Sequence, residues 1–184
     1  NLFHNQSIII TLDADELLFN KIHQLAELGY SIVEINGIDQ ELLKRTISKF
    51  PSLQIGAGNV INTHQLEACY QSGAHFVTSP GFSPSMAQTA NVYSIVYLPG
   101  VATISEAMQA IHFSCHHVRP FPATLSFCTL LNKYLPQLRL FPAEIECDEV
   151  DHFLSLPAVK AVSVINPEIK QLRALQASVF ESID

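Results

Sequence analysis

The fold can be read from residues 30–57, which run YSIVEINGIDQELLKRTISKFPSLQIGA. Residues 30–36 form a short apolar run typical of a buried strand, and residues 53–57 form a second one. The segment between them predicts an amphipathic helix that stops at Pro51, with an apolar side formed by Leu42, Leu43, Ile47 and Phe50. Two strands joined by one helix predict a βαβ unit, in which the strands are parallel.

The same alternation extends in both directions along the chain without a linker. Further strands are expected at residues 7–12, 76–79, 93–98, 117–121, 138–141 and 159–165, each followed by an amphipathic segment. Eight strands alternating with eight helices predict an α/β fold, a compact (β/α)8 TIM barrel, with an open doubly wound sheet as the alternative. With 184 residues the chain is expected to form a single barrel domain, 1–184.

Several helix starts are marked by polar capping residues. Asn62, Ser83 and Thr103 each precede an apolar-periodic segment, and Pro84 and Glu106 strengthen the second and third of these signals. The last helix is expected to begin with Asn166 as its cap and Pro167 in its first turn. A seventh helix is expected around Val150, Phe153 and Leu154.

Composition limits the classes of function. Hydrophobic residues make up 48% of the chain and charged residues 15%, so it can bury a sizeable core. Ten basic against seventeen acidic residues give a net charge of −7, with no basic stripe, so nucleic acid is not an expected partner. The sequence shows no leader and no apolar run of membrane-spanning length, so we expect no membrane association and a cytoplasmic location.

Cysteine and histidine spacing gives no indication of a metal site. The four cysteines lack the close pairs of zinc sites or disulfide frameworks, so free thiols are expected; they are Cys69, Cys115, Cys128 and Cys147. His116 and His117 are adjacent, but no third ligand stands at a plausible spacing. Neither a metal nor another cofactor is expected.

Two charged residues stand inside predicted strands. Side chains alternate along a strand, so Glu34 shares a face with Ile32 and Asn36, and that face is expected to point into the barrel. By the same alternation Arg119 points inward from the sixth strand. A buried carboxylate must be paired, hydrogen-bonded or protonated. The two residues therefore predict either a structural ion pair or a site for proton transfer and anion binding.

A series of short motifs resembles the KDPG/KHG aldolase family, the bacterial 2-keto-3-deoxy-6-phosphogluconate and 4-hydroxy-2-oxoglutarate aldolases. The motifs are VEI at 33–35, GAGNV at 56–60, SPG at 79–81, LPGVAT at 98–103 and RPFPA at 119–123. The resemblance implies a (β/α)8 barrel, usually a homotrimer, that cleaves a 2-keto acid to pyruvate and an aldehyde. In the family this reaction passes through a Schiff base on a lysine of the sixth strand.

The resemblance also assigns roles to individual residues. Glu34 falls on the family's general acid/base, Pro80 and Phe121 fall on pocket walls, and Gly56 and Gly58 fall on the third-strand loop. These five positions match the family pattern, and we take them as candidate catalytic or substrate-binding residues.

The sequence departs from the family where the reaction depends on charge. The Schiff-base lysine falls on Arg119, the carboxylate-binding arginine on Ile38 and the threonine of the third-strand motif on Asn59. The phosphate loops fall on residues 143–146 and 165–167, where Glu144 would repel a phosphate and Pro167 has no N–H to donate. An arginine stays protonated and cannot form an imine, so Schiff-base catalysis is expected to be lost.

Three functional hypotheses follow. In the favoured one, the protein has kept the aldolase fold, has lost Schiff-base catalysis and binds a small carboxylate near Arg119 and Glu34. In the second, it is an enzyme acting on an unphosphorylated 2-oxo acid, with Glu34 enolising the substrate and Arg119 or Asn59 stabilising the enolate. In the third, the fold serves only for assembly or interaction, and the ion pair fills the core.

Overall fold

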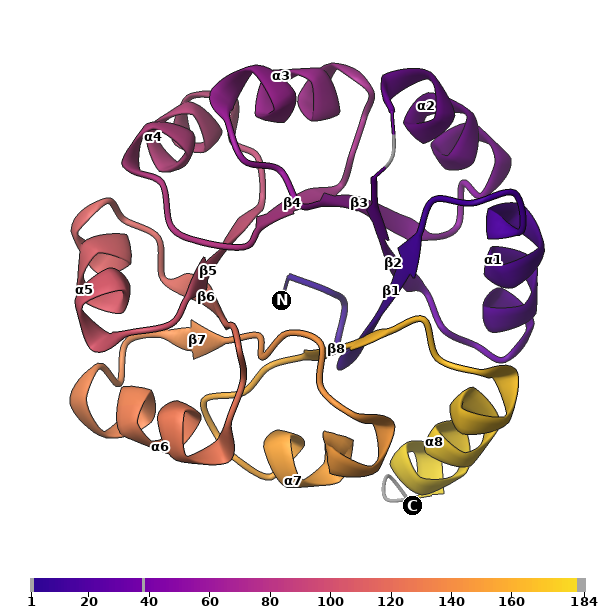
Figure 1. Ribbon diagram of the computed structural model, residues 1–184. Helices are drawn as coiled ribbons and strands as arrows, with labels where there is room; N and C mark the ends of the chain where they lie inside the picture. Colours follow the sequence, from indigo (N-terminus) through magenta and orange to yellow (C-terminus); the bar gives the residue numbers. More distant parts are fainter. Residues whose placement is uncertain (1, 38, 182–184) are drawn as a thin grey trace.

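A computed structural model describes residues 2–37 and 39–181, with the side chains of 177–181 excepted. Strands and helices alternate from one end of the chain to the other (Figure 1). The strands are β1 (Ile8–Asp13), β2 (Ile32–Asn36), β3 (Gln54–Gly58), β4 (Phe76–Ser79), β5 (Tyr97–Val101), β6 (His117–Pro120), β7 (Arg139–Leu140) and β8 (Val162–Ile165). The helices are α1 (Leu18–Glu27), α2 (Gln40–Lys49), α3 (Thr63–Gln71), α4 (Pro84–Tyr93), α5 (Ile104–His112), α6 (Leu125–Tyr134), α7 (Val150–Leu154) and α8 (Ile169–Glu181), with a 3₁₀ turn at Cys147–Glu149.

The eight strands form one parallel sheet in the order β7-β6-β5-β4-β3-β2-β1-β8. The sheet curls round an axis with the helices outside it, giving the (β/α)8 barrel-like fold that the alternation predicts (Figure 1). Backbone hydrogen bonds also link the segments that contain the two outermost strands, from Leu140 N to Ala158 O, from Lys160 N to Leu140 O and from Ser163 N to Pro142 O. The sheet order rules out the alternative of an open doubly wound sheet, whose strand order reverses at a switch point.

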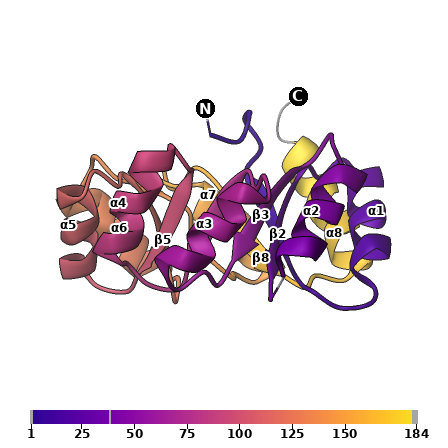
Figure 2. The same ribbon diagram turned by 90° about the horizontal axis from the view of Figure 1, so that it is seen from above.

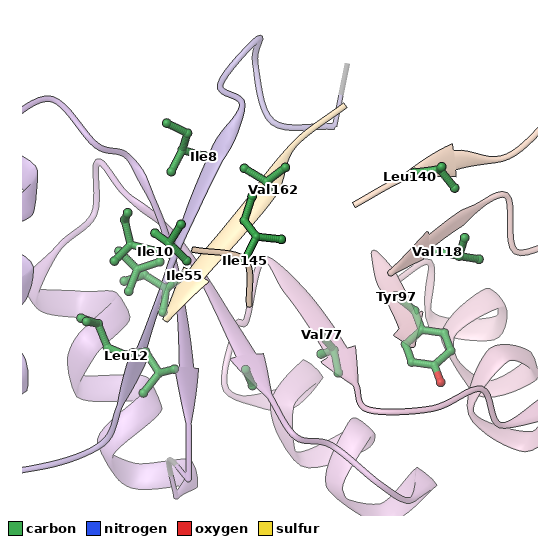
Figure 3. Packing of buried hydrophobic residues seen from close by; sticks show 14 of the residues in the cluster. Ile8, Ile10, Leu12, Ile55, Val77, Tyr97, Val118, Leu140, Ile145 and Val162 are labelled. Atoms are coloured by element: carbon green, nitrogen blue, oxygen red, sulfur yellow. The ribbon is translucent and has the colours of Figure 1, made fainter. Parts of the chain in front are cut away.

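The outward side chains of the strands pack beneath the helices and make the larger hydrophobic core. Ile10, Leu12, Ile55, Val77 and Val118 belong to this layer (Figure 3). The interior of the barrel holds a smaller apolar cluster near the N-terminal ends of the strands, formed by Phe3, Ile9, Ile32, Phe76, Leu98, Phe141 and Ala161. Apolar side chains therefore fill one end of the interior.

Residues 2–7, which precede β1, cover that end of the barrel. They cross the central opening in Figure 1 and lie at one end of the barrel in the turned view of Figure 2. The ring of Phe3 packs edge-on against Phe76 and Phe141, with centroids 5.2 and 5.9 Å away. The apolar cluster and these residues therefore close the N-terminal end of the barrel, and the other end of the interior lies at the C-terminal ends of the strands.

Three of the expected helix starts are confirmed. The side chains of Asn62, Ser83 and Thr103 accept hydrogen bonds from the backbone N–H groups of Gln65, Met86 and Glu106. Each bond satisfies one N–H that would otherwise have no partner in the first turn.

Two expectations about local structure are wrong. Strand β5 begins at Tyr97 instead of residue 93, because α4 continues to Tyr93 and ends at Ser94, whose φ of 57° is left-handed. Asn166 does not cap the last helix, which begins at Ile169. Its side chain instead bonds Asp13 at the end of the neighbouring strand β1, donating from Nδ2 to Oδ2 at 2.8 Å and accepting from the backbone N–H at 3.1 Å.

Candidate functional site

A polar layer lies in the barrel interior between the apolar cluster and the C-terminal rim. Alternation along β1, β2 and β6 turns Thr11, Glu34 and Arg119 inward, since their neighbours Ile10, Val33, Ile35 and Val118 pack outward under the helices. All three polar residues are buried, with Glu34 2% and Arg119 8% exposed. The structure therefore places the two charged residues where the sequence alternation predicts them.

Both oxygens of the Glu34 carboxylate have partners. Thr11 donates its hydroxyl to Oε1 at 2.8 Å, and Arg119 Nη1 lies 3.3 Å from Oε2. The ion pair spans the barrel interior, because β3, β4 and β5 lie between β2 and β6 in the sheet. The carboxylate is thus held at one orientation from both sides, and the arginine carries a counter-charge that compensates part of the cost of burial.

Glycines in β3 leave room for the polar layer. A Cβ on Gly58 would overlap the Asn36 amide oxygen and come within 3.2 Å of the Glu34 side chain. A Cβ on Gly56 would lie 2.4 Å from the Phe76 ring. The expectation that these glycines form a loop is wrong, because both belong to β3. Because they have no side chain, they leave space on β3 for the side chains of Phe76, Asn36 and Glu34.

The rim above Arg119 carries a second carboxylate. Glu144 follows β7 with a left-handed φ of 56°, and its backbone N–H donates to the Ser163 hydroxyl at 2.8 Å. Although the residue is exposed overall, partial burial of its carboxyl raises its pKa. The positive charge of Arg119 opposes this rise, while the negative charges of Glu34 and Asp13 add to it. Glu144 therefore acts electrostatically on the same site.

One buried hydroxyl in this interior lacks a partner. Thr78 lies on β4 next to Val77, which packs outward, so its own side chain faces inward, and it is 1% exposed. Its Oγ1 forms no hydrogen bond with the described residues. An unsatisfied buried hydroxyl costs free energy.

The remaining predicted site residues stand closer to the rim. Asn59 follows β3 directly, is exposed and has a left-handed φ of 57°. Pro80 is exposed after β4, and its carbonyl oxygen fills the place that a Cβ on Gly100 would take. Phe121 follows β6 and is half-buried. These residues surround the C-terminal ends of β3 to β6, while the predicted family position at residue 38 lies outside the described part of the chain.

No described lysine takes the place of Arg119 inside the barrel. Five of the six lysines lie on helices α1, α2, α6 and α8, and Lys160 precedes β8 at the opposite end of the barrel from Arg119. Across residues 2–37 and 39–181 there is also no group of three His, Cys, Asp or Glu side chains arranged to hold a metal ion. The ionisable groups of the polar layer are therefore Glu34, Arg119 and, at its rim, Glu144 and Asp13.

Sequence reasoning missed three parts of this arrangement. Thr11 was not singled out, although the alternation that turned Glu34 inward would also have found it in the run IIITLD at 8–13. The pair of Asp13 and Asn166 joins residues 153 positions apart, and no local signal predicts such a contact. The electrostatic reach of Glu144 to Glu34 and Asp13 likewise depends on closure of the barrel.

Comparison with known proteins identifies the family of this chain. The model of the family described as KDPG and KHG aldolase matches residues 5–178, which is nearly the whole chain. The chain belongs to the KDPG and KHG aldolase family. Within it, a 2-dehydro-3-deoxy-phosphogluconate aldolase of Pseudomonas aeruginosa is 28% identical over 84% of this chain and 74% of its own length. A Pseudoalteromonas atlantica aldolase of the same name is 36% identical, over 47% of this chain and 40% of that protein, so that match spans less than half of the relative.

A solved aldolase structure shows the same fold. The KDPG aldolase of Legionella pneumophila, crystallised with pyruvate captured as a covalent carbinolamine intermediate, superposes with a TM-score of 0.86 and 26% identity, covering 97% of this chain and 96% of that one. The Zymomonas mobilis enzyme with 3-phosphoglycerate has a TM-score of 0.85 at 22% identity over 97% of this chain and 94% of that one. The polar layer of Thr11, Glu34 and Arg119 is thus the interior of an aldolase-family barrel.

None of the helices in the described part of the chain has the length and apolar content needed to cross a membrane. The four cysteines are all free thiols, and Cys128 is the one that is fully buried.

Proposed function

We propose that this protein is a KDPG/KHG aldolase relative that binds a small carboxylate or 2-oxo acid at Arg119 and has no Schiff-base aldolase activity. The family reaction is retro-aldol cleavage of a 2-keto acid to pyruvate and an aldehyde. The observation that carries the proposal is the guanidinium of Arg119 in the barrel interior, 3.3 Å from the Glu34 carboxylate. Imine formation needs a neutral amine, and a guanidinium with a pKa above about 12 does not provide one.

The geometry supports anion binding at the same group. A guanidinium has five N–H donors, and one ion pair, from Nη1 to Glu34, is formed with the described residues. A ligand carboxylate that reaches the layer from the rim can bind to the remaining N–H groups in the forked arrangement that arginine favours. Asn59, Pro80, Phe121, Gly56 and Gly58 are the proposed neighbours of that ligand.

Charge at the rim favours an unphosphorylated ligand. Glu144 interacts electrostatically with Arg119, so its negative charge would repel a doubly charged phosphate bound at Arg119. A carboxylate carries less charge and is repelled less by Glu144. Pro167, on the neighbouring rim segment, has no backbone N–H with which to bind a phosphate.

A second candidate function rests on the fixed position of Glu34. Its carboxylate can remove a proton from the carbon next to the carbonyl of a bound 2-oxo acid, and the C–H electron pair then forms the enolate. The Arg119 charge stabilises the enolate oxygen. Returning the proton to carbon completes an exchange that leaves the substrate unchanged. In a third candidate, the protein serves only for assembly, and the Glu34–Arg119 pair stabilises the barrel interior.

Family membership also supports a single barrel domain that assembles as a homotrimer and acts in the cytoplasm without a metal or other cofactor. Sedimentation or light scattering of the full chain measures the assembly directly. A monomer at micromolar concentration would contradict the proposed trimer.

The main proposal is tested by trapping. The protein is incubated with pyruvate and borohydride, and its mass is measured; in parallel, pyruvate release from KDPG and from 4-hydroxy-2-oxoglutarate is followed. We expect no adduct and no pyruvate release, but saturable binding of pyruvate by calorimetry. An adduct on any side chain overturns the loss of Schiff-base chemistry. Loss of pyruvate methyl protons in D₂O without an adduct would favour the enolising enzyme, and absence of binding would favour the assembly role.

A further inference from the structure

A cavity opens at the other end of the barrel from Arg119. It has a volume of about 750 Å³ and lies between residues 2–6 and the N-terminal ends of β6, β7 and β8. A volume of this size is typical of small-molecule sites. The edge-to-face contacts of Phe3 with Phe76 and Phe141 separate the cavity from the polar layer that contains Arg119.

In the described part of the chain, the charged residues that line this cavity are both basic. Arg139 begins β7 and Lys160 precedes β8, and both are exposed. No aspartate or glutamate among residues 2–37 and 39–181 lines it, although acidic residues outnumber basic ones by seventeen to ten in the chain as a whole. Such a concentration of positive charge in an acidic protein raises the local concentration of small anions.

The barrel backbone holds these basic groups side by side. His117 of β6 pairs in register with Arg139 of β7, and the backbone N–H of Lys160 donates to the carbonyl of Leu140 at 2.9 Å. The two charges and the imidazole therefore come from three adjacent strand starts, which are more rigid than a loop. Burial and the positive charge of Arg139 lower the pKa of His117, which favours the neutral imidazole, a group that can donate one hydrogen bond and accept another.

The cationic groups keep donors available for a ligand. Arg139 forms no ion pair with any residue in 2–37 or 39–181. The Lys160 ammonium donates one hydrogen bond, to the carbonyl of Pro157 at 3.0 Å, and an ammonium has three donors. Beside these groups the wall is apolar, formed by Phe3, Phe141 and Val159, with the His117 ring 5.7 Å from that of Phe141.

We propose that this cavity binds a small organic anion, with its phosphate or carboxylate group on Arg139 and Lys160 and its apolar body against Phe3 and Phe141. The forked guanidinium matches either headgroup, and the ammonium acts beside it as a point charge. The site is separate from the polar layer at Arg119 and does not depend on the function proposed for it.

A single tryptophan provides a local probe. The chain has no tryptophan, and Gln6 lines the cavity, so Gln6→Trp introduces the protein's one indole at the site. Fluorescence of this variant is titrated with phenyl phosphate, with benzoate and with uncharged benzyl alcohol. We expect saturable changes with one or both anions and none with the alcohol, and the stronger anion identifies the preferred headgroup.

Charge-removing variants locate the binding. In the Gln6→Trp background, Arg139→Gln and Lys160→Gln should together weaken binding by about tenfold or more, since each removes a charged hydrogen-bond donor. Lys170→Gln on α8, which removes one positive charge outside the cavity, should leave binding unchanged. No saturable change up to roughly 10 mM anion, or undiminished binding after loss of Arg139 and Lys160, overturns the proposal.

Discussion

Arg119 on β6 and Glu34 on β2 form an ion pair across the barrel interior, with Nη1 and Oε2 3.3 Å apart. The sheet places three strands between them, so the contact depends on curling of the whole sheet and not on local sequence. Thr11 fixes the other carboxylate oxygen. Arg119 therefore compensates part of the cost of burying the Glu34 carboxylate.

Replacing Arg119 with lysine should restore the missing nucleophile. Arg119→Lys keeps a cation opposite Glu34 but supplies an amine that can lose its proton and attack a carbonyl. We expect borohydride and pyruvate to produce a covalent adduct in this variant and none in the unmodified protein, as measured by intact mass. Peptide mapping should place the adduct at position 119.

A matched variant excludes labelling elsewhere. Arg119→Gln removes the cation without adding an amine, so it should give no adduct under the same conditions. Equal labelling of the Arg119→Lys and Arg119→Gln variants would mean that another lysine reacts, and the assignment of the sixth-strand position would then be wrong.

Thr11 and Thr78 allow one chemical change to be compared at two places in the same interior. The Thr11 hydroxyl donates to Glu34, whereas Thr78 Oγ1 is buried without a described partner. Thr11→Val should lower the free energy of unfolding by roughly 1–3 kcal/mol, because Glu34 loses a charge-assisted hydrogen bond. Thr78→Val should be neutral or stabilising, because it removes an unsatisfied hydroxyl. Urea unfolding of both variants checks the sign; equal losses would indicate an unseen partner for Thr78.

The fold was predictable because its signals repeat locally. Each βα unit carries an apolar strand and an amphipathic helix, and the caps at Asn62, Ser83 and Thr103 mark helix starts within three residues. The inward direction of Glu34 and Arg119 followed from alternation alone. The prediction for Asn166 was wrong because its sequence context fits a helix cap, whereas the pairing of β8 with β1 places its side chain beside Asp13. Local sequence patterns do not predict contacts between residues of strands that are far apart in the chain.

Gly58 is expected to be intolerant of even one added carbon. Gly58→Ala places a Cβ that overlaps the Asn36 amide oxygen and lies 3.2 Å from the Glu34 side chain, so the polar layer has no room for it. Overpacking of this kind should lower the free energy of unfolding by about 1–3 kcal/mol, and displacement of Glu34 should weaken pyruvate binding as well.

Gly81 provides the control for this substitution. It lies near the same rim, but a Cβ there meets nothing within 4 Å. Gly81→Ala should change stability by less than about 0.5 kcal/mol. Urea denaturation compares the two variants, and similar stability of both would show that the space beside Asn36 is larger than the structure indicates.

Glu144 should make both stability and anion binding depend on pH. Its carboxyl has a raised pKa in the folded protein, chiefly through burial, so the folded state binds its proton more tightly than the unfolded chain does. Stability from this group is therefore lost as the pH rises from the unfolded pKa through the raised folded value. Glu144→Gln removes the ionisation, so the variant should be the more stable protein at neutral pH, and this advantage should disappear in acid, where the carboxyl is protonated in both states.

Pyruvate should also bind the Glu144→Gln variant more tightly at neutral pH, because a negative charge near Arg119 is gone. Unfolding and calorimetric titrations at pH 4 and 7, with the exposed neighbour Glu146→Gln as control, measure both effects; an advantage that persists unchanged in acid would show that Glu144 acts through packing instead of charge.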